Sequence, residues 1–362
     1  MTKFQVRKMV MPFLYIQGRG AIQQLGEQVS IVGKSAFVVG ESVALSIAGD
    51  RAKLSLTSAG VDIAAWDDTV KECTYAAIDR LVKRGKESGA DIVIGVGGGK
   101  AVDTAKATAM RMDVPAITVG TQCATNADAS AESVVYTEDH EYVDFIRLTR
   151  SPFAVIEDTD IIAAAPLRFI VQGMGDALAC KFEGEAFAKA RKMKRDGPLP
   201  PAAALALADT CYKNLLSRGT KAVRKLRNEE HSQEVEEIVE TVKLISCLAF
   251  ENTGTALAHA LHNGLTKTRE VKGEHGEIVA YATIVQAVYE RRPDKEVGAI
   301  VEWCEKVGLP TTLSDLGAPS KDSLNLAAEH ACNVDPDILN MPRRVRPSEL
   351  LKAIEKVERG IC

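Results

Sequence analysis

Short apolar runs alternate with longer amphipathic stretches along the first part of the chain. The short runs are rich in β-branched residues, as buried β-strands are, and the longer stretches repeat their apolar residues at helical spacing. The expected strands are residues 35–40, 61–66, 91–99 and 115–121, and the expected helices are residues 42–60, 74–90 and 100–112. Strands joined by crossover helices predict a mostly parallel sheet with helices on both faces.

The pattern changes further along the chain. Residues 131–148 predict a β-hairpin, and residues 153–158 predict one more strand. After Pro166 helical periodicity continues almost without strand signal. We therefore expect an α/β domain with a mostly parallel, Rossmann-like sheet at residues 1–163 and an all-α domain at residues 164–362.

Composition and charge narrow the functional classes. A net charge of −4 provides no overall basic surface for nucleic acid or anionic lipid, and the basic segments 189–197 and 221–230 are expected to be solvated helix faces. No apolar run reaches the roughly 18 residues of a membrane-spanning helix. The eight cysteines are scattered without a CxxC pair, which suits reduced thiols. We expect a cytoplasmic protein without nucleic-acid or membrane partners.

A run of glycines stands between a strand-like run and a helix: Gly97, Gly98 and Gly99. Without Cβ atoms they let backbone amides approach a phosphate, and the helix N-terminus adds partial positive charge. A dinucleotide is the natural ligand of such a turn, with Lys100 and Asp103 beside it at the start of the helix. The spacing is not GxGxxG, so a tight turn for close helix packing is the alternative. Asp103 would then complement the helix dipole, and Lys106 would be a surface cation.

Glu41 directly follows the expected strand at residues 35–40. An acid at this place can accept hydrogen bonds from an adenosine ribose and repel a 2′-phosphate, which favours NAD over NADP. A solvated loop glutamate is the alternative.

Three of the six histidines lie close together in the chain. His259 and His262 are three residues apart in an apolar stretch expected to be helical, and His275 follows in a loop-like segment. Imidazole nitrogens are common ligands of zinc, iron and other divalent metals. Asp176 lies among small and apolar residues, where a buried carboxylate needs a partner. Each histidine taken alone also fits a hydrogen-bonded core residue, and spacing by itself does not show that these side chains meet.

Five motifs occur in an order and spacing that resemble the glycerol dehydrogenase branch of the iron-containing (group III) alcohol dehydrogenases. They are GVGGGKAVDTAKA, GMGDALA, AHALHNGLT, EHGE and NMP, and together they extend over nearly the whole chain. The resemblance implies a dehydroquinate synthase-like architecture. Residues 1–163 would bind the dinucleotide and residues 164–362 would bind the metal and the substrate. A homo-oligomer is also implied.

The resemblance implies roles for individual residues of the helical part. Asp176, His259 and His275 would bind one catalytic divalent metal, zinc in the first place and iron as the alternative. His262 would lie next to the ligands, as an orienting or proton-relay residue and not as a ligand.

The resemblance likewise implies an NAD site in the α/β part. The glycine turn would hold the pyrophosphate, and Glu41 would meet the adenosine ribose. Residues that would line the nicotinamide side are Thr121, Ser130, Val134 and Tyr136.

Two positions depart from the family pattern. The segment TNAD stands in place of TDAP, so Asn126 replaces an aspartate that lies near the polyol in typical glycerol dehydrogenases. Glu132 stands where an apolar residue is usual. We therefore expect Asn126 to influence the choice of substrate, whereas the fold and the metal ligands are unaffected.

The expected activity is the reversible, metal-dependent, NAD-linked oxidation of a small polyol or vicinal diol to the ketone. One alternative is the reduction of small 2-oxo acids or aldehydes on the same fold. Another is a lyase or cyclase similar to dehydroquinate synthase, which uses NAD transiently. A non-catalytic NAD-binding or assembly protein is the alternative outside the enzymes, and the complete set of metal-ligating residues argues against it. The partner would be a small-molecule alcohol or carbonyl compound.

Overall fold

The computed structural model of the chain describes residues 6–139, 142–194 and 198–360. The chain divides into two compact units. The sheet unit consists of Val10–Ile170 with Asn228–Cys247, and the helical unit consists chiefly of Val171–Arg227 with Leu248–Cys362. Segment 228–247 belongs with the sheet because the Gln17 side chain donates to a Glu236 carboxylate oxygen at 2.8 Å. The functional division between residues 163 and 164 stays a prediction.

The sheet unit is built on a six-stranded parallel sheet with the order β1-β8-β5-β4-β2-β3, as the alternating pattern predicted. Its strands are β1 (Leu14–Gly18), β2 (Ser35–Gly40), β3 (Asp62–Asp67), β4 (Ile92–Gly97), β5 (Ala116–Gly120) and β8 (Ala154–Asp158). The edge strand β1 was not expected, because its short, half-buried run provides little signal.

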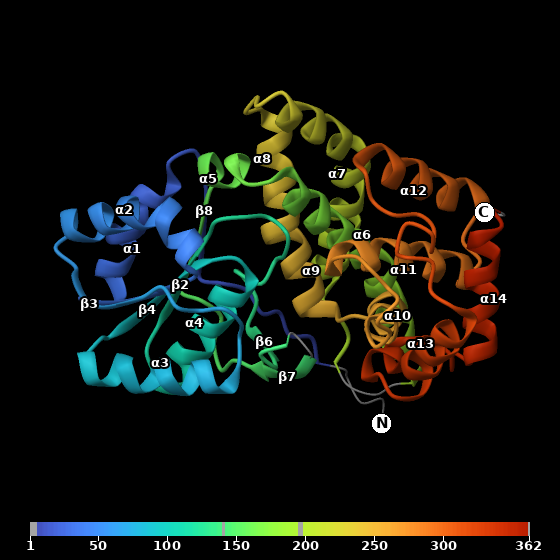
Figure 1. Ribbon diagram of the computed structural model, residues 1–362, viewed down its shortest axis with the longest axis horizontal. Helices are drawn as coiled ribbons and strands as arrows, with labels where there is room; N and C mark the ends of the chain where they lie inside the picture. Colours follow the sequence, from blue (N-terminus) through green and yellow to red (C-terminus); the bar gives the residue numbers. More distant parts are fainter. Residues whose placement is uncertain (1–5, 140–141, 195–197, 361–362) are drawn as a thin grey trace. The chain divides into compact units, whose positions relative to one another are not determined.

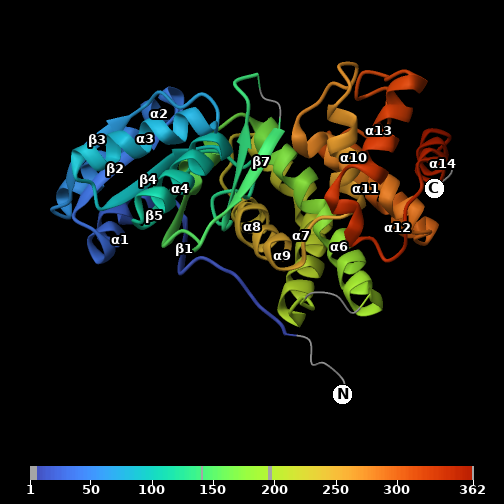
Figure 2. The ribbon, with the colours of Figure 1, turned by 90° about the horizontal axis from the view of Figure 1, so that it is seen from below.

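Helices cover both faces of this sheet (Figures 1 and 2). They are α1 (Leu25–Val32) and α2 (Ser42–Ser58) on one face, and α3 (Tyr75–Ser88) and α4 (Gly99–Met112) on the other. Alternate residues of β2 enter the two layers: Val38 packs in the core that includes Leu25 and Leu56, and Phe37 packs in the core that includes Leu81. Full burial on both faces explains why the central strands read as continuous apolar runs.

The expected hairpin consists of β6 (Glu132–Tyr136) and β7 (Tyr142–Arg147), which pair antiparallel outside the six-stranded sheet (Figure 2). Strand β8 leads into the short helix α5 (Thr159–Ala164). Helix α8 (Gln233–Glu240) continues into a π-helical turn at Thr241–Ile245.

The described residues of the helical unit form helices and loops only. The helices are α6 (Leu167–Lys194), α7 (Ala202–Arg227), α9 (Ser246–Thr253), α10 (Leu257–Thr266), α11 (His275–Tyr289), α12 (Asp294–Val307), α13 (Lys321–Asn333) and α14 (Pro347–Glu358), of which α6 and α9 begin in the sheet unit. Helix α11 is buried around its whole circumference from Ile278 to Tyr289, so it is the centre of this unit.

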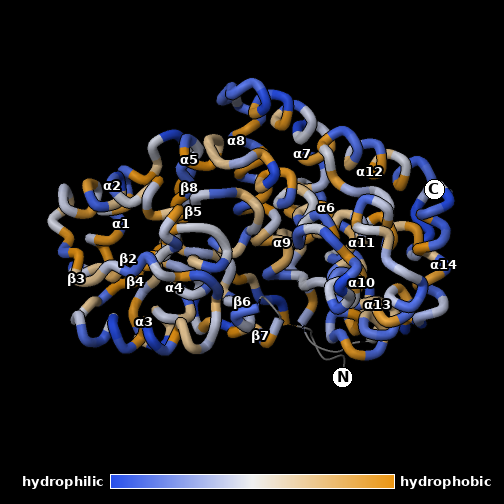
Figure 3. Tube along the Cα trace, viewed as in Figure 1, coloured by the Kyte–Doolittle hydropathy of each residue, from blue (hydrophilic) through white to orange (hydrophobic). Residues whose placement is uncertain are grey.

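Other helices bury one side only. The tube along α3 and α12 alternates between hydrophilic and hydrophobic stretches (Figure 3). Among the described residues, no helix combines the length and the apolar character needed to cross a bilayer.

Candidate metal site and dinucleotide turn

Three metal-ligating side chains from three helices converge in the helical unit. Asp176 comes from α6, His259 from α10, and His275 is the first residue of α11. One ligand atom of each lies within 4.8 Å of the others. Nε2 of both histidines lies 3.3 Å from Oδ1 of Asp176. One carboxylate with two imidazoles is a donor set that suits zinc or ferrous iron.

The three side chains differ in exposure. Those of Asp176 and His259 are 9% and 12% exposed, whereas that of His275 is 47% exposed, so a further ligand can reach the cluster from the His275 side. Burial by itself would raise the pKa of Asp176, but hydrogen bonds with His259 and His275 hold this pKa well below its usual range. Asp176 is therefore ionised and ready to bind a cation.

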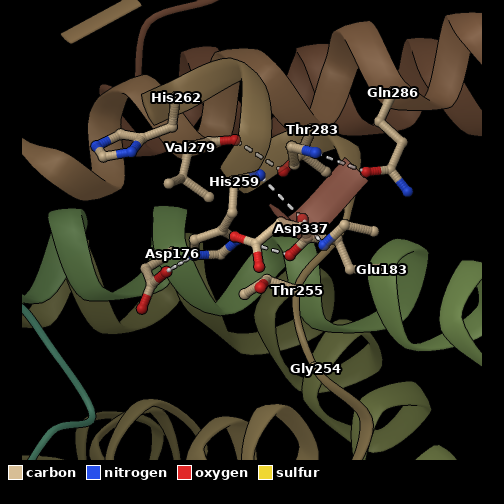
Figure 4. Close-up of polar contacts among 12 residues, drawn as sticks. Asp176, Glu183, Gly254, Thr255, His259, His262, Val279, Thr283, Gln286 and Asp337 are labelled. Carbon is tan, nitrogen blue, oxygen red and sulfur yellow. Dashed lines mark hydrogen bonds and ion pairs between the residues drawn. The ribbon is translucent and has the colours of Figure 1, made fainter. Parts of the chain in front are cut away.

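Glu183 contacts the ring nitrogen of His259 that faces away from Asp176. Its Oε2 lies 2.6 Å from Nδ1 of His259, and its Oε1 accepts from the backbone amides of Ala256 and His259 at 2.7 and 2.9 Å. Figure 4 shows Asp176 and Glu183 on opposite sides of the His259 ring. A carboxylate on Nδ1 fixes a proton there, so that Nε2, which faces Asp176, is the nitrogen that a metal ion would bind, as in many metal-bound histidines.

Sequence reasoning did not single out Glu183. A signal was present, because Glu183 follows Asp176 by two helical turns on the same face of α6. Burial lowers the pKa of His259, but the Glu183 and Asp176 carboxylates outweigh burial and raise this pKa well above its usual range.

His262 lies beside His275, with ring centroids 4.3 Å apart, and its centroid lies 6.5 Å from that of His259. Its Nε2 lies 3.0 Å from Nδ1 of His275, and its Nδ1 lies 2.9 Å from Oδ1 of Asn263. The Asn263 amide in turn donates to Asp335 at 2.8 Å. Burial, reinforced by His275, lowers the pKa of His262 well below its usual range, so this ring is neutral. A neutral ring has one N–H, which fits a chain of donors running from His275 to Asp335.

The glycine turn joins β4 to α4 at the place where the sheet reverses its strand order. Strand β3 lies on one side of β2, and β4 lies on the other. Open α/β sheets bind ligands at the carboxyl ends of strands at such a point. Gly97 has a φ of +151°, and a Cβ there would lie 2.7 Å from that of Ala101. Close packing therefore requires glycine at this position, as the tight-turn alternative proposes.

Glu41 lies at this turn and is not a solvated loop residue. Its carboxylate accepts a hydrogen bond from the backbone amide of Gly98, and burial raises its pKa overall. Lys100 pairs with the nearly buried Glu72 at 2.9 Å. Thr121 also reaches the turn, because its backbone amide donates to the Gly97 carbonyl at 3.1 Å.

The four remaining candidates for the dinucleotide site contact other residues of the sheet unit: Asp103, Ser130, Val134 and Tyr136. Asp103 Oδ1 lies 2.9 Å from Lys106 Nζ, and Asp103 Oδ2 accepts from the backbone amide of Val134 at 3.1 Å. Lys106 also donates to Ser130 Oγ at 2.9 Å. Lys106 is 1% exposed, so its interpretation as a surface cation was wrong. Tyr136 lies in the hairpin, with its ring centroid 6.4 Å from that of Tyr142.

The two departures from the family pattern have partners within the sheet unit. Asn126 Nδ2 donates to Ser246 Oγ at 2.9 Å. Glu132 pairs with Arg147, its neighbour on β7, at 3.0 Å.

A buried ion cluster was not expected from the sequence. Lys243, in the π-helical turn, pairs with Asp128 and lies 3.7 Å from Glu157, and all three side chains are 0% exposed. Nothing in the local sequence pattern distinguishes these residues from surface charges.

The comparisons with known proteins agree with one another. The model of the iron-containing alcohol dehydrogenase family matches residues 12–159. A glycerol dehydrogenase of Thermotoga maritima is 38% identical over 354 residues, covering 97% of this chain and 96% of that protein. A glycolaldehyde reductase of Halobacterium salinarum is 34% identical, covering 95% and 94%. The crystal structure of a probable glycerol dehydrogenase from Sinorhizobium meliloti has a TM-score of 0.90 and 34% identity, covering 98% and 99% of the two chains.

Proposed function

This chain belongs to the iron-containing alcohol dehydrogenase family, in the branch of the glycerol dehydrogenases, and on that premise we propose that it is an NAD-linked, metal-dependent polyol dehydrogenase. It oxidises a small polyol or vicinal diol to the hydroxyketone, reversibly. The observation that carries the proposal is the convergence of Asp176, His259 and His275 within 4.8 Å, with His275 exposed on one side.

The residues present fit one divalent ion held by Asp176, His259 and His275, with zinc as the first choice and iron as the second. Such an ion supplies Lewis acidity, which favours loss of the proton from a substrate hydroxyl and polarises a carbonyl in the reverse direction. Glu183 holds His259 in the tautomer that leaves Nε2 free.

His262 orients His275 in the same way. With Nε2 of His275 directed towards Asp176, its Nδ1–H donates to His262, and the His262 Nδ1–H donates to Asn263. Because the next member of this chain is an amide, which does not readily pass on a proton, the arrangement favours orientation over proton relay. The proton released by the substrate then leaves through water on the exposed side of His275.

In our proposal the glycine turn and the backbone amides at the start of α4 would hold the pyrophosphate of NAD. Glu41 accepts hydrogen bonds from the adenosine ribose in place of the Gly98 amide that it now contacts. NAD, when bound there, would supply the capacity to accept or return a hydride. Asn126 contacts the polyol in place of the usual aspartate.

Reduction of a small hydroxyaldehyde is the second candidate activity, and the glycolaldehyde reductase among the relatives favours it. It uses the same residues in the opposite direction, because a group that helps a hydroxyl lose its proton also polarises a carbonyl.

Metal removal tests the function. The purified protein is stripped with a chelator, reloaded separately with zinc and ferrous iron, and assayed with NAD⁺ and glycerol, 1,2-propanediol or lactate, and with NADH and dihydroxyacetone or glycolaldehyde. Activity should disappear on stripping and return with one of the metals. Asp176→Asn and His275→Ala should abolish both metal binding and turnover, whereas His330→Ala, on α13, should not. Full activity in the stripped protein would contradict the proposal.

We further propose that the chain forms a homo-oligomer, as the resemblance implies. Light scattering of the purified protein tests this directly, and a monomeric mass at micromolar concentration would refute it.

A further inference from the structure

The loop that follows β5 is tied to the segment where α8 passes into α9. Asn126 donates from Nδ2 to Ser246 Oγ at 2.9 Å, and Asp128 pairs with Lys243. Lys243 lies in the middle of the π-helical turn and Ser246 directly follows the turn, and both are 0% exposed. These two links hold position 126 in one place relative to Ser246.

The hydroxyl of Ser246 decides which end of the Asn126 amide faces it. Ser246 Oγ donates its proton to the carbonyl of Val242 at 2.7 Å. Its oxygen is then an acceptor, so the amide must present its NH₂ group and turn Oδ1 away. Among the residues that the structure describes, none donates a hydrogen bond to Oδ1 of Asn126. The amide oxygen is therefore free to accept one from a ligand.

The loop is also held on its other side. Lys106 Nζ donates to the carbonyl of Ala127 at 2.6 Å and to Ser130, and Thr118 donates to the carbonyl of Asp128 at 2.9 Å. The buried ammonium group of Lys106 donates hydrogen bonds to several carbonyls of the loop. Moving the loop would break these bonds and leave a buried charge without partners, so the loop is held in place. Asn126 thus cannot easily adjust its position to compensate for a lost partner.

The same loop lies against the glycine turn. A Cβ at Gly98 would collide with the Gln122 side chain, and a Cβ at Gly99 would lie 3.1 Å from the Thr125 methyl group. Asn126 follows directly, at the carboxyl end of β5, beside β4. It therefore lies at the edge of the sheet where ligands of open α/β folds bind.

We propose that Ser246 is a positioning residue for the substrate: by holding Nδ2 of Asn126 it presents Oδ1 as the acceptor for a substrate hydroxyl group. This inference rests on the proposed polyol dehydrogenase function and specifies how a second hydroxyl is recognised. An ionised carboxylate has no proton to donate to Oδ1, so the fixed amide favours polyols over 2-hydroxy acids. An aspartate at position 126 would place an oxygen against the Ser246 oxygen unless the hydroxyl turned away from Val242.

A double-mutant cycle on the metal-loaded enzyme tests the proposal. The KM and kcat for glycerol are measured for Asn126→Ala, Ser246→Ala and the double variant. Ser246→Ala should raise the KM for glycerol about tenfold, as expected for one hydrogen bond, with a smaller change in kcat. Because the serine acts through the asparagine, the double variant should be no worse than Asn126→Ala alone.

The control is Ser55→Ala, at another buried serine of the sheet unit. The Ser55 hydroxyl also makes two hydrogen bonds: it donates to the carbonyl of Gln23 and accepts from the backbone amide of Gly26. It should leave the KM for glycerol unchanged. The urea unfolding midpoint of all variants measures the Asn126–Ser246 contact independently of turnover, and the cycle should be non-additive there too. Polyol oxidation with an unchanged KM in Ser246→Ala, or additive effects of the two substitutions, would overturn this inference alone. Absence of polyol oxidation in the unaltered enzyme would instead overturn the proposed function.

Discussion

Two buried carboxylates determine the orientation and the protonation of the histidine at the candidate metal site. Asp176 and Glu183 lie on the same helix face and bind the two ring nitrogens of one histidine, His259. One carboxylate is in the position of a metal ligand, and the other fixes the tautomer. Asp103, by contrast, is equally buried but engaged with Lys106 and Val134. The chemical role of each acid depends on its nearest donors and not on its residue type.

Glu183→Gln should lower the affinity for the divalent metal about 10- to 100-fold. Glu183 now accepts hydrogen bonds from three N–H groups. In either orientation, the NH₂ group of a glutamine would face at least one of these donors, and that hydrogen bond would be lost. Competition with a fluorescent chelator measures the affinity. Glu185→Gln is the matched control, because Glu185 lies on the same helix but pairs with Arg292. Equal metal affinities in the two variants would show that Glu183 does not support the site.

Glu41→Ala should narrow the preference for NAD over NADP. The carboxylate at the glycine turn disfavours a 2′-phosphate by repulsion, and alanine removes this repulsion. The ratio of kcat/KM for NAD to that for NADP checks the prediction. The assignment of Glu41 fails if the unaltered enzyme already prefers NADP.

Between elements, a charged cluster ties β3 to α3. Asp67, at the end of β3, is 1% exposed and accepts from Arg80 at 2.6 Å and from Arg84 at 2.7 Å. Burial by itself would raise the pKa of Asp67, but the hydrogen bonds from Arg80 and Thr69 lower it to about 2. The cluster anchors the helix that packs beside α4, and α4 carries the glycine turn.

The contribution of Asp67 to stability should depend on pH. Because the pKa is about 2 in the folded chain and 3.8 ordinarily, the stabilisation is complete above about pH 5 and is lost as the pH falls towards 2. Asp67→Asn should cost about 1–2 kcal/mol at pH 6, allowing for solvent around the arginines, and less at pH 3. Urea unfolding at both pH values measures the difference. Asp62→Asn, at the exposed start of β3, serves as control; a cost of Asp67→Asn that does not shrink with falling pH would contradict the linkage.

At the scale of the whole molecule, the two candidate sites belong to different compact units. The three candidate metal ligands all belong to the helical unit, and the glycine turn, Glu41 and Asn126 all belong to the sheet unit. Helices α6 and α9 each begin in the sheet unit and end in the helical unit.

Each ligand should therefore protect its own unit in hydrogen exchange. A ligand at 100 times its Kd raises the free energy of local opening by about 2.7 kcal/mol, which slows exchange about 100-fold. Zinc should slow exchange in α6, α10 and the start of α11, and NAD⁺ should slow it in β4 and α4. Exchange measured by mass spectrometry on the full chain maps both effects. Zinc protection confined to the sheet unit would refute the ligand assignment.

The sequence by itself determined the classes of element and their order. Continuous apolar runs between helical patterns predicted the parallel sheet, alternation at residues 131–148 predicted the hairpin, and 3.6-residue periodicity predicted the helices after Pro166. These features are local, because periodicity records which face of one element is buried. The motifs also named Asp176, His259 and His275 before any geometry was known.

Only the tertiary structure decided which side chains meet. Asp176 and His275 are far apart in sequence, and only the packing of α6, α10 and α11 brings their ligand atoms together. Sequence spacing also could not show that Lys106 and Lys243 are buried, or that segment 228–247 packs with the sheet. The local sequence around a helical lysine is the same kind of pattern whether the side chain faces water or a buried carboxylate. Its burial depends on partners supplied by distant segments, because a charge is stable inside a protein only where those partners compensate it.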